Sequence, residues 1–158
     1  MARITTNTTG TQPVIEISTD VANVANAALS IVCLQDVTIT NSTGVYSYTT
    51  FCTPDMNKLS TPADNEIAVN MVLDSEVYFG NAALGNTTAG YFGVSDISIN
   101  KIPVSFKVYY NSTANGAFYT QGVGFVTSLA PTVNPEAPVW VSPLTIAVDG
   151  SLTNGIES

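Results

Sequence analysis

The sequence contains no histidine and few charged residues. Among its 158 residues are no His, four Lys and Arg together, and twelve Asp and Glu, so that charged residues make up 10% of the chain and the net charge is −8. Without histidine the chain lacks the commonest general base and metal ligand, which excludes Ser-His-Asp, Cys-His and two-His metal arrangements. The basic residues are too few to form a patch that would hold a phosphate backbone. Catalysis of these kinds and tight binding of nucleic acid are therefore not expected.

Cysteine and long hydrophobic runs are also scarce. The two cysteines, Cys33 and Cys52, lack Cys-x-x-Cys spacing and lie in strand-like segments, which favours buried reduced thiols and leaves a disulfide as the alternative for a secreted chain. No run approaches the roughly 18 apolar residues of a membrane span, and the N-terminus has no apolar core of signal-peptide length. The sequence therefore predicts a protein that is made in a cytoplasm and does not enter a membrane.

Thr, Ser and Asn take the place of the missing charge. Hydrophobic residues make up an ordinary 45% of the chain, and its length allows one domain with a core that needs no metal or disulfide. A surface poor in Lys and Glu but rich in short polar side chains suits close packing between proteins. A secreted domain with a polar surface is the alternative interpretation.

Apolar residues that alternate with polar ones predict a mainly β fold. The expected strands span residues 14–18, 29–40, 45–51, 67–79, 104–110, 118–128 and 139–148. Asn and Gly at 41–44 predict a turn, and Asn-Gly at the end of 111–116 predicts a hairpin connection. A short helix is expected within residues 80–100, with Ala82, Ala83 and Leu84 at its start.

The polar segments set the expected domain boundaries. Residues 1–12 are predicted to form an N-terminal arm, residues 13–153 a single β domain, and residues 154–158 a free C-terminal tail. Within the domain, residues 53–65 lose the apolar period and contain two prolines, which predicts a long loop between strands.

Two acidic residues form a candidate catalytic or cation site. Asp74 and Glu76 are two positions apart, so on a strand both would point to one face. There they could act as a hydrolase pair or bind a cation, or they could simply face solvent at the edge of the sheet. No calcium-binding loop, Gly-x-Ser-x-Gly elbow or Ser-x-x-Lys motif accompanies them. The sequence therefore predicts no enzyme, no metal site and no cofactor.

The C-terminal third carries a resemblance to a known family. Residues 122–133 read Gly-Val-Gly-Phe-Val-Thr-Ser-Leu-Ala-Pro-Thr-Val, followed by Glu136 and a final strand with a Gly-Ser-Leu exit over 140–152. Together with the segment Leu-Gln-Asp-Val-Thr-Ile at 34–39, this pattern resembles bacteriophage tail tube proteins, the major tail proteins of long-tailed phages.

The resemblance implies a fold, an assembly and a location. The fold would be an antiparallel β-sandwich or open barrel with one short flanking helix. Six subunits would form a ring with an inner β-barrel, and rings would stack into a tube that is an acidic conduit for DNA ejection. The partners would be further copies of the chain, the tape measure, tail terminator and distal tail proteins, and DNA in passage. The protein would be assembled in the host cytoplasm and reside in the virion tail.

Three sets of residues follow from the resemblance. The loop between rings would contain Pro54, Asp55, Lys58, Pro62 and Asp64. The lumen would receive Asp36, Asp74 and Glu76 in one strand register, and a slip of one residue would reverse this. The sheet between subunits would contain Phe125, Val126, Trp140 and Ile146. A capsid decoration, neck or tail terminator protein, and a carbohydrate-binding β-sandwich, remain as alternatives.

Overall fold

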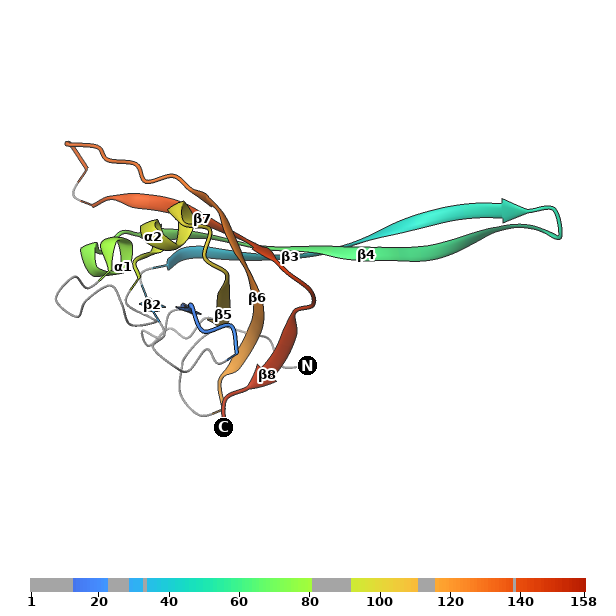
Figure 1. Cartoon of the computed structure of the whole chain (residues 1–158), viewed down its shortest axis with the longest axis horizontal. Coiled ribbons are helices and arrows are strands. Elements are labelled where there is room, and N and C mark those ends of the chain that lie inside the picture. Colours follow the sequence, from blue (N-terminus) through green and yellow to red (C-terminus); the bar gives the residue numbers. More distant parts are fainter. Residues whose placement is uncertain (1–12, 23–28, 33, 81–91, 111–115, 138) are drawn as a thin grey trace.

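The chain folds into one antiparallel β-sheet with short helices beside it (Figure 1). The computed structural model describes residues 13–22, 29–32, 34–80, 92–110, 116–137 and 139–158. The strands are β1 (Val14–Ser18), β2 (Leu29–Ile31), β3 (Leu34–Thr50), β4 (Thr53–Val72), β5 (Val104–Tyr109), β6 (Phe118–Leu129), β7 (Val141–Val148) and β8 (Thr153–Ile156), and the helices are α1 (Ser75–Phe79) and α2 (Val94–Ile99). The mainly β, antiparallel fold expected from the sequence is confirmed.

The sheet joins strands from distant parts of the chain. Its order is β2-β1-β5-β6-β7-β4-β3, and β8 pairs with the first residues of β6. β7 pairs with the later residues of β6 on one side and with β4 on the other. Across the described residues the sheet is open, since its outermost strands β2 and β3 are not paired with each other.

The core lies on the concave side of this curved sheet, where the alternating apolar residues point. Alternate residues of β4 (Ile67, Val69 and Met71) and of β5 (Val104, Phe106 and Val108) are buried. The apolar side of α2, with Val94 and Ile97, belongs to the same cluster. Each such large side chain stabilises the fold by about 1.5–3 kcal/mol, so the alternation read in the sequence reports the packing that holds the sheet together.

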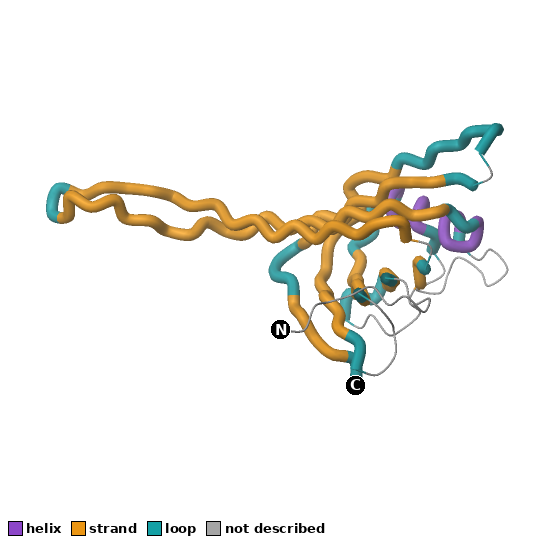
Figure 2. The backbone as a smooth tube through the Cα atoms, turned by 180° about the vertical axis from the view of Figure 1, so that it is seen from behind, coloured by secondary structure: helices purple, strands orange, loops and turns teal. Residues whose placement is uncertain are grey.

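β3 and β4 form a hairpin that extends far beyond the rest of the sheet (Figures 1 and 2). β4 pairs with β7 only from Glu66 to Val72, whereas its pairing with β3 continues to Thr53. Residues 41–65 are therefore called the outer arm. At about 3.3 Å per strand residue, the outer arm projects roughly 30 Å from the body.

The turn predicted at 41–44 and the loop predicted at 53–65 are both wrong. These segments pair with each other as strands of the outer arm, and the chain turns at residues 51–52 instead. Gly44 lies at a shift in register, where a Cβ atom would overlap the hydroxyl group of Thr61. The loop prediction at 53–65 failed because almost every described side chain there is exposed, so that this segment shows no apolar period. The strand predicted at 45–51 lies in the same arm and is confirmed as far as Thr50.

The predictions for residues 75–79 and for the C-terminal segment are also wrong. Residues 75–79 form α1 instead of extending the preceding strand: Asp74 caps the helix by accepting a hydrogen bond from the backbone N–H of Glu76. The C-terminal segment is not a free tail, since β8 pairs with β6. Two helices, α1 and α2, thus take the place of the one that was expected, and α2 lies within the predicted range 80–100.

Several predictions concern residues outside those described. These are the N-terminal arm at 1–12, the helix start at Ala82, Ala83 and Leu84, the connection at 111–115, and Cys33. Cys52 is described, and the prediction that it is buried is wrong, because it is exposed at the tip of the outer arm.

Candidate assembly interface

The outer arm is the feature most suited to contact another molecule. It buries little within its own chain, and a two-stranded hairpin without further support is only marginally stable in water. Its side chains nonetheless include large apolar ones. The exposed large hydrophobic residues of the outer arm are Val45, Tyr46, Tyr48, Phe51, Met56 and Leu59. Such a concentration of apolar side chains on an extended arm marks a surface for protein contact.

One face of the outer arm is aromatic. Tyr46 and Tyr48 are two residues apart on β3, and their rings stack with centroids 6.2 Å apart. Leu59 lies opposite Tyr46 in the ladder, so it belongs to the same face. This face offers an apolar strip that a flat partner surface can cover.

The base of the outer arm is held to the body by a buried amide. Asn65 is buried, and its side-chain NH₂ donates a hydrogen bond of 3.4 Å to the carbonyl of Gly150, in the turn between β7 and β8. This long hydrogen bond connects the base of the arm to that turn, while the Oδ1 atom of the same amide has no hydrogen-bond partner among the described residues.

All five residues predicted for the loop between rings belong to the outer arm. Pro54 lies on β4, and Asp55, Lys58, Pro62 and Asp64 are exposed along the same strand. The structure thus brings them together on one projecting element, although that element is a strand and not a loop. Their contact with a second ring stays a prediction.

The acidic residues predicted for a lumen are divided between two elements. Asp36 lies on β3, where its carboxylate accepts hydrogen bonds of 2.8 and 3.0 Å from the side-chain amide of Asn70. Asp74 and Glu76 lie at the start of α1, where their negative charge suits the helix N-terminus. The expectation that the latter two point to one face of a strand is wrong, because the segment is helical.

The four residues predicted for a sheet between subunits also separate into two pairs. Phe125 and Trp140 are exposed and can contact a partner. Val126 and Ile146 are buried within the chain, so their side chains belong to the subunit's own core. The structure therefore removes this second pair from the candidate interface.

A small pocket with mostly apolar walls lies beside α1. Figure 1 shows α1 at the end of the molecule opposite the tip of the outer arm. The pocket has a volume of about 260 Å³. The lining residues are Leu73, Asp74, Ser75, Tyr78, Phe79 and Trp140. We call it the end pocket. Sequence reasoning missed it because it depends on α1, whose five residues were predicted as a strand.

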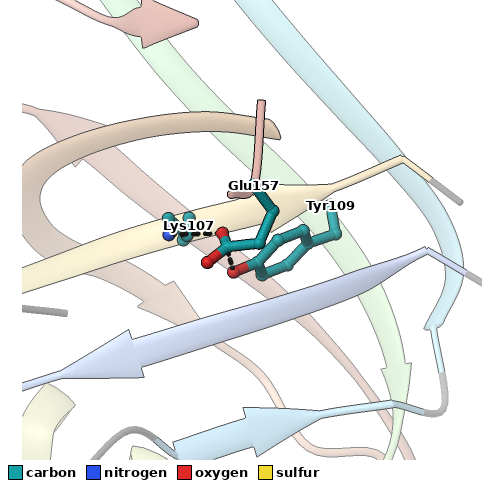
Figure 3. A network of polar contacts seen from close by, with 3 residues as sticks. All are labelled: Lys107, Tyr109 and Glu157. Carbon is teal, nitrogen blue, oxygen red and sulfur yellow. Dashed lines mark hydrogen bonds and ion pairs between the residues drawn. The ribbon is translucent and has the colours of Figure 1, made fainter. Parts of the chain in front are cut away.

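The C-terminal segment is held by a polar network on β5 (Figure 3). Lys107 and Glu157 form an ion pair of 2.8 Å, and the hydroxyl of Tyr109 donates a hydrogen bond of 2.9 Å to the same carboxylate. The ammonium group of Lys107 also lies 4.2 Å from the ring centroid of Tyr119 on β6. The network explains why the last residues are ordered against the sheet.

The network shifts the pKa values of its members. The hydrogen bonds from Lys107 and from Tyr109 lower the pKa of the Glu157 carboxyl below its ordinary value. For Lys107, burial lowers the pKa, but the hydrogen bonds to Glu157 and Tyr109 outweigh it, so the pKa is raised overall. Burial raises the pKa of Glu16, which lies near the same charges.

Replacing Glu157→Gln is expected to destabilise the subunit in a pH-dependent way. A carboxyl whose pKa is lowered by folding contributes stability above its unfolded pKa of about 4.3, and this contribution is lost as the pH falls through the folded value. The loss at neutral pH should be no more than about 1 kcal/mol, because the side chain remains partly in water. The melting temperatures of the unmodified protein and of the variant, measured from neutral pH downward, should converge at a pH below the folded pKa of Glu157. A constant difference at every pH would contradict the ion-pair account.

Neither a metal-binding cluster nor a membrane-spanning helix is found among the described residues. Among them, no group of three His, Cys, Asp or Glu side chains is placed to hold a metal ion. The helices of the described segments are too short and too polar to cross a bilayer.

Comparison with known proteins gives similarity in structure but not in sequence. No model of a known protein family matches the chain, and no curated protein matches it. A chain in the tail of an empty gene transfer agent particle, determined by helical refinement with C6 symmetry, has a TM-score of 0.58 and 14% identity, over 88% of this chain and 93% of that chain. The chain has the fold of tail tube proteins. The resemblance expected from the sequence is thus confirmed at the level of the fold.

Structures of an extracellular contractile injection system show the same likeness. A chain in its sheath–tube complex in the extended state has a TM-score of 0.59 and 12% identity, over 92% of this chain and 88% of that chain. A chain in the sheath/tube terminator structure has a TM-score of 0.56 and 13% identity, over 91% of this chain and 93% of that chain. The tail-tube fold therefore accounts for nearly the whole length of the chain, and not for one motif alone.

Proposed function

We propose that this chain is the structural subunit of a tail tube in a phage-like particle. Six copies form a ring, rings stack into a tube, and the tube belongs to the virion tail. The observation that carries the proposal is the likeness of fold over 88% of the chain to a component of a tail that was refined with C6 symmetry. The role is structural and requires no catalytic group or cofactor.

The outer arm suits the contact between successive rings. It projects roughly 30 Å, which exceeds the reach of any side chain and allows a subunit to touch a neighbour along the tube axis. Its exposed apolar side chains need a surface to lie against. The predicted ring-contact residues, from Pro54 to Asp64, lie on this arm and give it a polar edge.

The charge of the chain suits a conduit for DNA. Each subunit carries a net charge of −8, and a tube of such subunits repels a phosphate backbone more than it attracts it. DNA would pass without adhesion during ejection. Asp36, Asp74 and Glu76 are the proposed lumen residues. The tape measure, terminator and distal tail proteins are the proposed partners at the interior and ends of the tube.

Electron microscopy of the purified protein tests the proposal directly. Negative-stain images should show rings or tubes of uniform width, and native mass spectrometry should give a particle of six subunits of 16.6 kDa each. Protein that remains monomeric at high concentration, even when seeded with preformed tail tips, would overturn the proposal.

A tail terminator is the second candidate function, because one similar chain comes from a sheath/tube terminator structure. A terminator closes a tube and does not extend it. Single rings that never stack, but that bind to the end of a tube made by another protein, would favour this function over the first.

A further inference from the structure

The two ends of the molecule carry apolar surfaces that complement each other. The tip of the outer arm carries the exposed side chain of Phe51, and the end pocket is lined in part by residues of α1. The tip and α1 lie at the two ends of the longest axis of the molecule (Figures 1 and 2).

At the tip, Phe51 is fully exposed in the two-residue turn between β3 and β4. A hairpin turn usually contains Gly, Asn or Asp, because these residues adopt turn conformations easily and tolerate water. An aromatic side chain at this position does not stabilise the turn. Its position indicates a contact outside the subunit, since large apolar side chains are stabilised by burial.

At the other end, most of the surface of the end pocket is apolar, although Asp74 and Ser75 also line it. Phe79 is 61% exposed and Trp140 is 45% exposed. The rings of Tyr78 and Phe79 meet edge to face with centroids 4.7 Å apart, which leaves an aromatic wall for a further ring. A pocket of about 260 Å³ with such walls suits one aromatic side chain.

Attraction between copies of this chain has to be largely apolar. Each copy has a net charge of −8 and only four basic residues, and Lys107 is already paired with Glu157 inside the subunit. Few cations are left to form ion pairs with a second copy. Contacts that bury aromatic side chains avoid this shortage and hold at high salt.

We propose that Phe51 of one copy inserts into the end pocket of a second copy. Because Phe51 and the end pocket lie at opposite ends of one chain, the contact is heterologous and repeats along an axis without closing. This inference rests on the proposed tube function and specifies the residues that join one ring to the next. The occupant of the pocket is a second copy of the chain, and other tail proteins would use it only at an end of the tube.

A disulfide between the two surfaces gives the sharpest test. Cys52 is an exposed thiol beside Phe51 at the tip, so a Phe79→Cys substitution places its partner in the pocket. In assembled tubes, mild oxidation is expected to join Cys52 to the introduced cysteine of another copy, as shown by peptide mass spectrometry. An Ile99→Cys variant is the matched control, because Ile99 is exposed on the neighbouring helix α2 outside the pocket lining. Trp140→Cys replaces the first variant if that one does not fold.

Each outcome decides between the two proposals. Cross-linking at the pocket but not at position 99 supports the insertion. Tubes that form while the pocket cysteine stays reactive toward a thiol reagent overturn the insertion and leave the tube function intact. Absence of rings and tubes from the unmodified protein overturns the tube function and the insertion with it.

Substitution of Phe51 tests the insertion independently, through the protein concentration at which tubes assemble. Phe51→Ser is expected to raise the protein concentration needed for tube assembly by about 30-fold or more, as loss of a buried aromatic anchor does at other interfaces. Rings of six should persist, because Phe51 lies far from the body of the sheet. Ile99→Ser is the control and should leave this concentration unchanged. An equal effect of both substitutions would contradict the insertion.

Discussion

Removing the outer arm from both strands at once is expected to abolish tube assembly while the subunit still folds. The deletion takes out residues 43–63 and joins Ser42 to Asp64, which lie opposite each other in the ladder, through an Asn-Gly turn. The removed residues contribute no side chain to the core, so the denaturation midpoint should change little. Tubes should be absent even at about a hundred times the concentration that suffices for the complete chain.

The geometry of the hairpin dictates this symmetric deletion. Deleting residues 53–65 alone would remove only one side of the ladder and leave the outer half of β3 as an unpaired strand edge, which promotes aggregation. The two deletions can be compared by native mass spectrometry and negative-stain microscopy. Normal tubes from the symmetric deletion would contradict a stacking role for the outer arm, and loss of the rings themselves would assign the arm to contacts within a ring.

Replacing Phe106→Ala is expected to cost about 3–5 kcal/mol of unfolding free energy, since it leaves a large cavity in the core. Phe106 lies on β5, is fully buried, and pairs with Gly122 on β6. A Cβ atom at Gly122 would lie 2.9 Å from the end of the Phe106 ring, so the glycine leaves the space that the ring fills. A domain of ordinary stability would lose about a fifth or more of its total of about 5–15 kcal/mol.

Urea unfolding at low protein concentration measures this loss. Phe118→Ala is the matched control, because it removes the same ring from the exposed start of the adjacent strand β6. Its effect should stay within about 0.5 kcal/mol. Similar losses for the two variants would contradict the placement of Phe106 at the centre of the core.

The sequence predicts the inner parts of the sheet well, because one face of each strand is buried there. Ile67, Val69 and Met71 alternate with less buried residues, and their burial is the cause of the period. The outer arm buries neither face, so packing leaves no apolar period after residue 52, although the β-branched and aromatic residues at 45–51 did indicate a strand. The turn residues at 41–44 are then accommodated within the ladder, where Gly44 marks a shift in register.

Short elements explain the remaining differences. α1 has five residues, fewer than two helical turns, and its Val, Tyr and Phe favour strands in isolation. Asp74 at the N-cap, followed by Glu76 in the first turn, was the signal for a helix. β8 has only four residues, and its place is set by pairing with the distant strand β6 and by the contacts of the adjacent Glu157 with Lys107 and Tyr109.

The same reasoning separates the predicted site residues. Exposure of Phe125 and Trp140 could not be distinguished from burial of Val126 and Ile146 by residue type, because all four are apolar and lie on or beside strands. Prediction of the end pocket would have required the positions of both α1 and the segment before β7, which are far apart in the sequence. The outer arm, in contrast, could have been inferred by pairing the strand predicted at 45–51 with the polar segment that follows residues 51–52.

The place of β7 in the strand order determines when the sheet can be completed during synthesis. β7 alone connects β4 to β6, yet it is synthesised after both of them. On a ribosome, the hairpin of β3 and β4 closes early through local contacts, while the inner edge of β4 waits for Val141 and the residues that follow it. The sheet is therefore incomplete until β7 has been synthesised, because β4 and β6 are joined through it.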